Sequence, residues 1–292
     1  MPRVAASLET QTMTPKAELQ EHLEKRLARV AREQGLDQER LRRWISFLAL
    51  CGLLEKAVGE GIFDSYYLKG GVALELRFAM RARATKDLDI GLGGPRAGRL
   101  ALLQQATRLG FDEFTFRPKP GPREMEQADT VRVAVAVQYR TRAWQTIDVD
   151  LGPAGTPKID LVEPQVQGLV DLGLPVTSPV RCLGLPEQVA QKLHACTSQH
   201  SQNRARDVLD ILLIEMLGSL DYARTGAAAR RIFAERATHN FPAAFKLPAN
   251  WHGELEAMAI DLGLPYTNAA AIESQFQQMI GKLHMAESAV SK

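Results

Sequence analysis

Two short motifs bring together residues that could do chemistry. The first is Lys69-Gly70-Gly71, in which two glycines open an apolar helical stretch. Glycine has no Cβ and adopts positive φ readily, so backbone N–H groups in such a turn can approach a phosphate closely. The positive N-terminal end of the following helix attracts the same anion. The motif therefore predicts a phosphate-binding turn.

The second motif is Thr85-Lys86-Asp87-Leu88-Asp89. Residues i and i+2 of a strand face the same way, so Asp87 and Asp89 present two carboxylates side by side. Adjacent carboxylates repel unless a cation lies between them, and Mg²⁺ prefers such hard oxygen ligands. Either motif alone is weak, because Gly-Gly is usually a turn and Asp-x-Asp is often a solvated edge. Together and in this order they predict metal-dependent nucleotidyl transfer.

A third carboxylate is needed as a base and as a further metal ligand. Asp148 and Asp150 share one face of a predicted strand, and we favour Asp148, which directly follows Ile147. The alternative is an aspartate that simply faces water at a strand end. Asp160 is a weaker competitor.

A lysine on an apolar helix is a further candidate. Lys192 lies among Val189, Ala190, Leu193 and Cys196, where its burial is unfavourable unless it meets an anion such as a nucleotide phosphate. It could instead reach the surface along its aliphatic stem. Asp207 and Asp210, three apart on the next helix, could orient Lys192 or nearby arginines, contact a ribose or base, or form a surface network. His194 is assigned no role.

The elements that must position these residues follow from periodicity and turn signals. Residues 1–13 look like a disordered tail; two helices follow, the first starting at Thr14-Pro15 and the second capped by Asp37 and interrupted in its apolar stripe by Gly52. Strands are expected at 66–68, 87–92, 131–137 and 144–151, with helices at 72–80 and 101–109. Pro175, Pro179 and Pro186 indicate a linker. Helices are then expected at 187–197, 204–217, 222–237, 252–261 and 269–285.

This order predicts an α/β (α+β) fold with a mixed sheet core. We expect an N-terminal tail and helical preface at 1–61, a nucleotidyltransferase core at 62–180, and a helical domain at 181–292 that contributes nucleotide contacts. The chain of 292 residues is long enough for this arrangement.

Composition narrows the class of protein. The chain is 45% hydrophobic and 24% charged, with a net charge of +2, which are ordinary values for a soluble protein. It has no apolar run long enough for a membrane span and no signal core, so we expect a cytoplasmic protein and no membrane partner. Cys51, Cys182 and Cys196 are expected to be reduced and buried. Arginines around the two motifs indicate either a basic surface for nucleic acid or a solvated face.

Taken in order, the motifs resemble those of the AbiEii/AbiGii-type, or MenT-like, nucleotidyltransferase toxins. The resemblance covers about residues 65 to 215 and rests on five segments: Lys69-Gly70-Gly71-Val72-Ala73-Leu74, Arg83-Ala84-Thr85-Lys86-Asp87-Leu88-Asp89, Ile147-Asp148-Val149, Glu187 to Ala195, and Arg204-Ala205-Arg206-Asp207-Val208-Leu209-Asp210. Val72 stands where the family usually has Ser or Thr, so one hydroxyl contact to phosphate is missing.

The resemblance implies an Mg²⁺-dependent toxin that transfers a nucleotide from an NTP to an acceptor, such as the 3′ end of tRNA, and is restrained by a cognate antitoxin. It implies that Asp87, Asp89 and Asp148 are catalytic metal ligands and that Lys192 is catalytic. The nucleotide-binding residues would be Lys69, Gly70, Gly71, Thr85, Lys192, Asp207 and Asp210.

Two other functions remain open from the sequence. The same chemistry could serve a small-molecule or protein hydroxyl, in which case a closed pocket would replace a basic surface. Alternatively, the chain could be a non-catalytic nucleotide-binding relative, a reading that Val72 alone supports.

Overall fold

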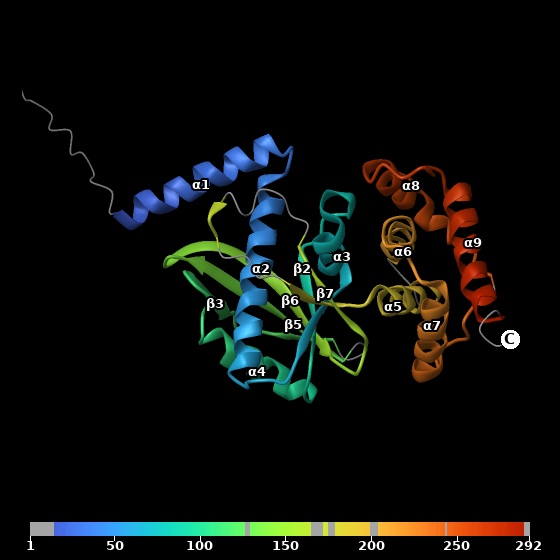
Figure 1. Ribbon diagram of the computed structural model, residues 1–292, viewed down its shortest axis with the longest axis horizontal. Helices are drawn as coiled ribbons and strands as arrows, with labels where there is room; N and C mark the ends of the chain where they lie inside the picture. Colours follow the sequence, from blue (N-terminus) through green and yellow to red (C-terminus); the bar gives the residue numbers. More distant parts are fainter. Residues whose placement is uncertain are drawn as a thin grey trace, which may run out of the picture.

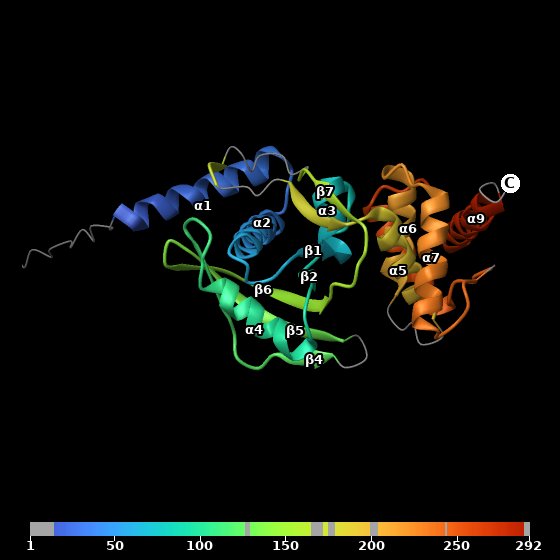
Figure 2. The same cartoon turned by 60° about the horizontal axis from the view of Figure 1, so that its bottom comes forward.

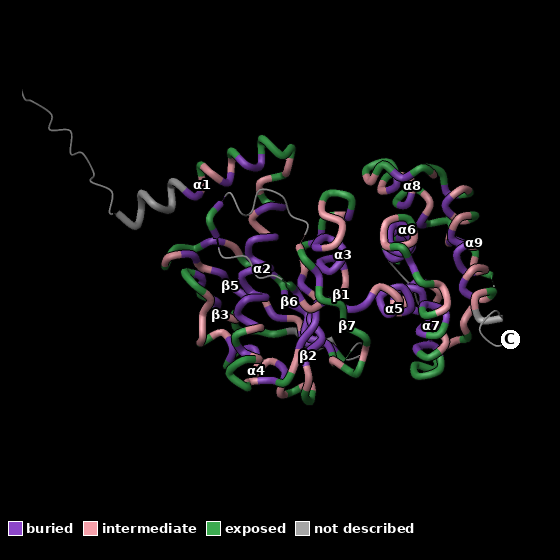
Figure 3. Tube along the Cα trace, in the orientation of Figure 1, coloured by how far each residue is buried: buried purple, intermediate pink, exposed green. Residues whose placement is uncertain are grey.

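The computed structural model describes residues 15–125, 129–164, 172–174, 179–198, 204–242 and 244–288; the predicted tail at 1–13 lies outside them. Buried side chains in these segments form two hydrophobic cores. The first runs from Leu23 to Cys182. The second joins Leu74 and Ala82 to apolar residues between Val189 and Leu283. Figure 3 shows buried segments both in the sheet with α2 (Gln38–Gly59) and in α5 (Leu185–Thr197), α6 (Ala205–Leu217) and α7 (Tyr222–Arg236).

The first core lies against one face of a mixed sheet. Within the described residues the sheet has eight strands, in the order β3-β5-β6-β2-β1-β8-β7, with β4 paired to β5. The bounds are β1 Tyr66–Lys69, β2 Asp87–Leu92, β3 Phe114–Pro118, β4 Arg123–Met125, β5 Thr130–Tyr139, β6 Arg142–Pro153, β7 Ile159–Val162 and β8 Val180–Leu183. The central strand β2 runs antiparallel to β1 and parallel to β6.

The two faces of the sheet differ because side chains alternate along each strand. One face carries Leu88, Ile90, Val149, Leu151 and their neighbours, all buried in the first core. Helices α2 (Gln38–Gly59) and α4 (Arg96–Thr107) supply the other side of that core (Figures 1 and 2). The opposite face carries the aspartates of β2 and β6. The fold thus holds the polar residues on the face away from α2 and α4.

The N-terminal helices are α1 (Pro15–Glu33) and α2, and the predicted Asp37 cap of α2 is confirmed by a 2.7 Å bond from the Arg40 backbone N–H. The helix is not broken at Gly52, where glycine interrupts the apolar stripe, and it ends at Gly59 as expected. A Cβ at Gly52 would come within 2.3 Å of the Phe111 ring. The glycine therefore makes room for an aromatic ring and does not break the helix.

Helix α3 (Gly70–Phe78) follows β1 directly and is continued by the short 3-10 helix η1 (Ala79–Arg81). The second core is formed mainly by α5 (Leu185–Thr197), α6 (Ala205–Leu217), α7 (Tyr222–Arg236), η4 (Ala249–Trp251), α8 (His252–Asp261) and α9 (Ala269–Ser288). These helices gather beside α3, at the opposite end of the molecule from α1 (Figure 1). All the C-terminal helices expected from the sequence are present.

The linker expected from its prolines is partly wrong. Strand β8 lies between Pro179 and Pro186 and pairs with β1 and β7, because the buried side chains of Val180 and Cys182 complete the first core. The three cysteines are free and buried as expected, and burial raises the pKa of each thiol. In the described part of the chain, no helix is long and apolar enough to cross a membrane.

Candidate active site

Strand register brings the sequence motifs together on the polar face of the sheet. Lys69 of β1 lies opposite Asp89 of β2. Asp87 and Asp89 lie opposite Asp148 and Asp150 of the parallel strand β6. Paired residues of neighbouring strands project to the same face, so four carboxylates and one lysine originate on a single patch.

The glycine turn packs directly on this patch. Gly70 has a φ of +64°, and a Cβ built on it would come within 1.9 Å of Asp89 Oδ2. A Cβ on Gly71 would come within 2.8 Å of the Thr85 hydroxyl. Only glycine permits both the backbone conformation and the contact at position 70. The predicted phosphate turn and the predicted metal carboxylates therefore belong to one site.

Asp87 is held by a short chain of polar contacts. The Thr85 hydroxyl donates to Asp87 Oδ1 at 2.9 Å, and the Thr85 backbone N–H donates to Glu75 Oε1 at 3.2 Å. Buried Glu75 also pairs with Arg40 at 2.9 Å and accepts from the Trp44 indole at 2.8 Å. Thr85 is itself buried, so its hydroxyl orients a carboxylate from within the protein.

The surroundings of Asp89 shift its pKa. Burial, followed by repulsion from Asp87 and Asp150, raises the pKa of Asp89 to about 6, although Lys69 opposes this. The surroundings therefore disfavour the charged form of Asp89 when no cation is bound. A cation bound there would relieve the repulsion.

The two aspartates of β6 differ in their surroundings. Asp150 is buried, and Arg132 of β5 donates to it through Nε at 2.6 Å and also through Nη2. The same guanidinium lies 3.5 Å from Asp87 Oδ2. Asp148 is exposed and lies directly opposite Asp87. Asp148 is thus the more accessible of the two carboxylates, and its role as third ligand stays a prediction.

Two glycines beside the patch leave room for the side chains of Lys69 and Tyr67. A Cβ at Gly152 would come within 2.6 Å of Lys69 Nζ, and one at Gly91 would come within 2.2 Å of the Tyr67 ring. Tyr67 reaches across Gly91 and donates to the Ala154 carbonyl at 2.7 Å. Burial lowers the pKa of Lys69, while Asp89 opposes the shift. Lys69 is thus a half-buried ammonium beside the carboxylates.

The second charged cluster lies on α5 and α6. Lys192 Nζ is 2.8 Å from Asp207 Oδ1 and 2.7 Å from Asp210 Oδ2. Arg83, from the loop before β2, forms a bidentate pair with Asp210 at 3.0 Å for both bonds. Burial disfavours the charge on Lys192, but Asp207 and Asp210 outweigh it and raise its pKa. The alternative in which Lys192 reaches the surface along its aliphatic stem is wrong, since the residue is buried and paired.

The two clusters interact electrostatically, but weakly: Lys192 opposes the net rise in the pKa of Asp89, and Asp87 adds to the larger effect of Asp210 that raises the pKa of Arg83. Among the described residues, no three His, Cys, Asp or Glu side chains come together as a metal site. The donor set still fits a divalent cation, because Asp87 and Asp89 share one face and repulsion from Asp87 contributes to the raised pKa of Asp89. Carboxylate oxygens suit Mg²⁺.

Three other residues considered in the sequence lie elsewhere. Asp160 is on β7, at the edge of the sheet, and pairs with Arg77 at 3.0 Å. Val72 is buried in the first core. His194 contacts Arg236 and Thr238, and burial lowers its pKa to about 4. These three positions add no group to the carboxylate patch.

Sequence reasoning missed the residues that support the patch. Arg132 was visible only as one arginine among several, because its place opposite Asp150 depends on the strand register. Glu75 and Gln188 stand in apolar helical segments and carried no signal of their own.

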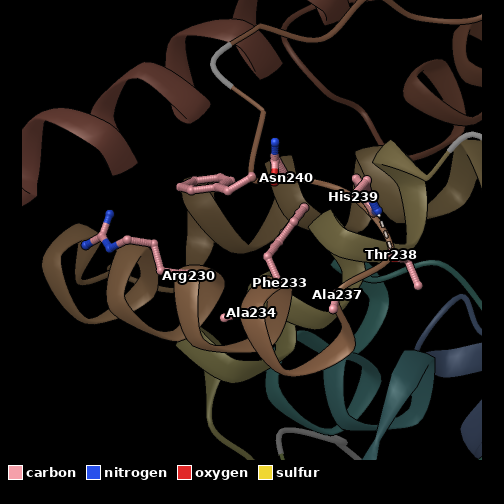
Figure 4. Close-up of a pocket in the computed structure, with 8 residues that line it drawn as sticks. Arg230, Phe233, Ala234, Ala237, Thr238, His239 and Asn240 are labelled. Carbon is pink, nitrogen blue, oxygen red and sulfur yellow. Dashed lines mark hydrogen bonds between the residues drawn. The ribbon is translucent and has the colours of Figure 1, made fainter.

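A cavity of about 560 Å³ lies in the helical part, beside the C-terminal end of α7. It is lined by Arg230, Phe233, Ala234, Ala237, Thr238, His239, Asn240 and Phe241 (Figure 4). None of the site residues expected from the sequence lines it.

Comparisons with known proteins agree with this architecture. One family model, described as nucleotidyl transferase AbiEii toxin of a type IV toxin–antitoxin system, matches residues 52–289. The chain is similar in structure to MenT4, a nucleotidyltransferase toxin from Mycobacterium tuberculosis H37Rv, with a TM-score of 0.52 and 16% identity over 88% of this chain and 89% of that one. This likeness confirms the mixed α/β fold.

Two structures of the antibiotic-resistance factor ANT(2″)-Ia are more distant. A solution structure has a TM-score of 0.37 and 13% identity over 66% of this chain and 92% of that one. A crystal structure with adenylyl-2″-tobramycin has a TM-score of 0.39 and 16% identity over 65% and 98% of the two chains. No curated protein sequence matches the chain.

Proposed function

Because this chain belongs to the AbiEii family of nucleotidyl transferase toxins, we propose that it uses Mg²⁺ to transfer a nucleotide from an NTP to the 3′ end of tRNA. The chain is a nucleotidyltransferase of a toxin–antitoxin system. What we propose in addition is the identity of its acceptor, tRNA, and of its cation, Mg²⁺. The observation that carries the proposal is the contact between Gly70 and Asp89. It supports the proposal because a turn that could bind phosphate then lies against the carboxylates that a metal-bound triphosphate requires.

Asp87, Asp89 and Asp148 would hold the metal. When bound there, Mg²⁺ neutralises the negative charge that develops on the transferred phosphoryl group. Thr85 orients Asp87 through its 2.9 Å hydrogen bond, which makes it a positioning residue in the nucleotide site. Arg132 keeps Asp150 neutralised, so the exposed Asp148 is the better third ligand.

The residues of the chain would then carry out an in-line displacement. The acceptor hydroxyl oxygen forms a bond to the α-phosphorus, the bond from that phosphorus to the bridging oxygen breaks, and pyrophosphate leaves. The proton of the hydroxyl passes to Asp148. Gly70 and Gly71 would bind the triphosphate through the uncapped first turn of α3, whose Lys69 cap residue makes no side-chain capping bond.

The charged cluster on α5 and α6 would contact the nucleotide from the other side. Lys192 is a buried cation shared by two carboxylates. We assign Lys192 to a phosphate, and Asp207 or Asp210 to the orientation of Lys192 and to the ribose or base. Lys69 lies nearer to the carboxylate patch and completes the positive surroundings of the triphosphate.

We also propose that the protein acts in the cytoplasm and is restrained by a cognate antitoxin. Residues 62–180 would form the catalytic core and 181–292 the domain that adds the Lys192 cluster, with 1–61 as preface. The described packing supports including α2 with the catalytic core, because Trp44, Phe47 and Leu54 lie in the same core as the sheet.

The test is to incubate the purified protein with each of the four α-labelled NTPs, total tRNA and either Mg²⁺ or a chelator. We expect label on tRNA with at least one NTP, only with the metal, and none with Asp87→Ala. Periodate treatment of the tRNA removes its 3′ diol and should abolish labelling.

Other outcomes would redirect the proposal. Label that survives periodate would place the acceptor elsewhere on the RNA. Label on the protein itself, or on a small molecule of a cell extract but not on RNA, would favour a protein or small-molecule hydroxyl as acceptor. Equal transfer with the chelator would remove Mg²⁺ from the mechanism.

A further inference from the structure

One hydrogen bond connects the helical part to the glycine turn. Gln188, near the start of α5, donates from Nε2 to the carbonyl oxygen of Gly70 at 2.7 Å. The two residues belong to different parts of the molecule, since α5 contributes to the second core and Gly70 begins α3 beside the sheet. The contact therefore reaches from the helical part into the centre of the candidate site.

The chemistry of this contact fixes the orientation of the amide. A carbonyl oxygen accepts but cannot donate, so the nitrogen side of Gln188 must face Gly70. Its Oε1 atom is then buried without a hydrogen-bond partner, and the side chain as a whole is only 1% exposed. An orphaned buried oxygen is unfavourable for folding. A side chain chosen for packing alone would avoid this penalty, which indicates that the amide nitrogen serves the glycine turn.

Gly70 is a position where the backbone needs such support. Its φ of +64° is a conformation that glycine adopts and leaves easily, because no Cβ restricts rotation. The carbonyl of Gly70 and the N–H of Gly71 belong to one planar trans peptide and point in opposite directions. Holding the carbonyl therefore also fixes the direction of the Gly71 N–H.

The contacts on the other side of the turn do not supply this restraint. Asp89 lies against the Cα of Gly70, and Thr85 against that of Gly71. Both contacts limit what side chain can stand there, but neither accepts from or donates to the Gly70 carbonyl. Among the interactions of the described residues, the Gln188 amide is the side-chain donor to that carbonyl.

We propose that Gln188 is a positioning residue for nucleotide binding: its amide fixes the Gly70–Gly71 peptide so that the first-turn N–H groups of α3 meet the triphosphate in a preset orientation. The proposal rests on the triphosphate-binding role given to this turn above. It also gives the helical part a direct effect on nucleotide affinity, in addition to the Lys192 cluster.

The variant that tests this is Gln188→Met. Methionine has nearly the length and volume of glutamine, has no donor, and removes the orphaned oxygen, so the fold should survive where Gln188→Ala would leave a cavity. Gln191→Ala on the same helix is the matched control, because Gln191 is partly exposed and no hydrogen bond of its side chain to the site is seen.

The first measurement needs no activity. Hydrogen exchange of the segment containing Lys69 to Leu76 reports on the amides of Ala73 and Leu74, which bond back to the carbonyls of Lys69 and Gly70 in a regular helix. We expect exchange there to be about tenfold faster in Gln188→Met than in wild type or Gln191→Ala. Unchanged exchange would overturn the proposal.

The second measurement separates positioning from general stability. The dissociation constant for a non-hydrolysable NTP should rise about tenfold in Gln188→Met, equivalent to about 1.4 kcal/mol, while transfer at saturating NTP falls less than about threefold. A lower kcat with unchanged NTP affinity would instead assign Gln188 to structure alone and overturn the proposal.

The outcomes also distinguish this inference from the proposed function. If wild type labels no RNA but exchange and NTP affinity respond to Gln188→Met, the acceptor chemistry falls and the positioning role stands. If wild type labels RNA but neither exchange nor NTP affinity responds to Gln188→Met, the acceptor chemistry stands and the positioning role of Gln188 is wrong. A wild-type protein that binds no NTP would overturn both.

Discussion

The carboxylate of Asp89 lies against the Cα of Gly70, so close that a methyl group on that carbon would come within 1.9 Å of Oδ2. The strand that carries the predicted metal ligands and the turn that carries the predicted phosphate-binding amides are thus one packing unit. Changing either residue must move the other.

The first prediction follows from this contact. Gly70→Ala should lower nucleotide transfer more than 100-fold, because alanine disfavours a φ of +64° and its methyl group would displace Asp89. Gly35→Ala is the control, since Gly35 has a φ of +63° and no atom within 4 Å of a Cβ. It should cost about 1 kcal/mol of stability and leave transfer intact. Equal activity in the two variants would show that the contact has no part in catalysis.

Much of this unit could be predicted from the sequence, because its motifs are local. Gly70-Gly71 and Asp87 to Asp89 each determine their own turn or strand, and the C-terminal helices follow from apolar periodicity. The sheet register could not be predicted, and it alone decides that Arg132 meets Asp150 while Asp148 stays exposed. Strand β8 was taken for a linker because four residues between prolines carry too little pattern. Gln188 resembles any polar residue on a helix until its partner on α3 is known.

The second prediction concerns the pH dependence of stability without metal. The folded-state pKa of Asp89 is about 6, above its usual value of 3.8, so the folded state binds the proton more tightly than the unfolded state. Stability should therefore fall as pH rises from about 4 to about 6 and stay lower above that range. Asp89→Asn removes this charge and should be more stable than wild type at pH 7.5 by on the order of 2 kcal/mol, but not at pH 4.

Urea unfolding at several pH values in chelator measures this difference. Asp160→Asn, at an exposed edge position, should show no such pH-dependent gain. Adding Mg²⁺ at pH 7.5 should stabilise wild type more than Asp89→Asn. If the aspartate and asparagine proteins have the same pH profile, the carboxylate is not under the repulsion inferred here.

The third prediction concerns Arg132, which competes with a cation for the same carboxylates. Arg132→Met should destabilise the metal-free protein by about 2 kcal/mol, because Asp150 is left buried without its partner; the partly exposed guanidinium keeps this below the value for a fully buried pair. The same change should tighten Mg²⁺ binding several-fold, since one positive charge leaves the patch. Calorimetric titration measures the affinity.

The control is Arg117→Met on the exposed side of β3, which should alter neither the stability nor the Mg²⁺ affinity. A weaker Mg²⁺ affinity in Arg132→Met would contradict competition between Arg132 and the cation.

The fourth prediction separates the two roles of Lys192. Lys192→Met should cost about 3 kcal/mol of stability, because it leaves Asp207 and Asp210 buried with less counter-charge. The double variant Lys192→Met with Asp207→Asn should recover much of that stability, while Asp210 keeps its bidentate pair with Arg83. If Lys192 contacts a phosphate, both the single and the double variant should bind NTP poorly. A stable double variant with wild-type NTP affinity would assign Lys192 to the fold alone.

The last prediction concerns the effect of the protein on a cell. Expression of the chain alone should arrest bacterial growth, and Asp87→Ala should relieve the arrest, because a slow enzyme can still exhaust a finite pool of acceptor ends, whereas binding would need protein in stoichiometric amounts. Asp160→Ala, on the sheet edge, is the control and should remain toxic. Growth curves together with labelling of cellular RNA give the readout. An Asp87→Ala variant that arrests growth as strongly as wild type would mean that toxicity comes from sequestration, and catalysis at the Asp87–Asp89 patch would then not explain it.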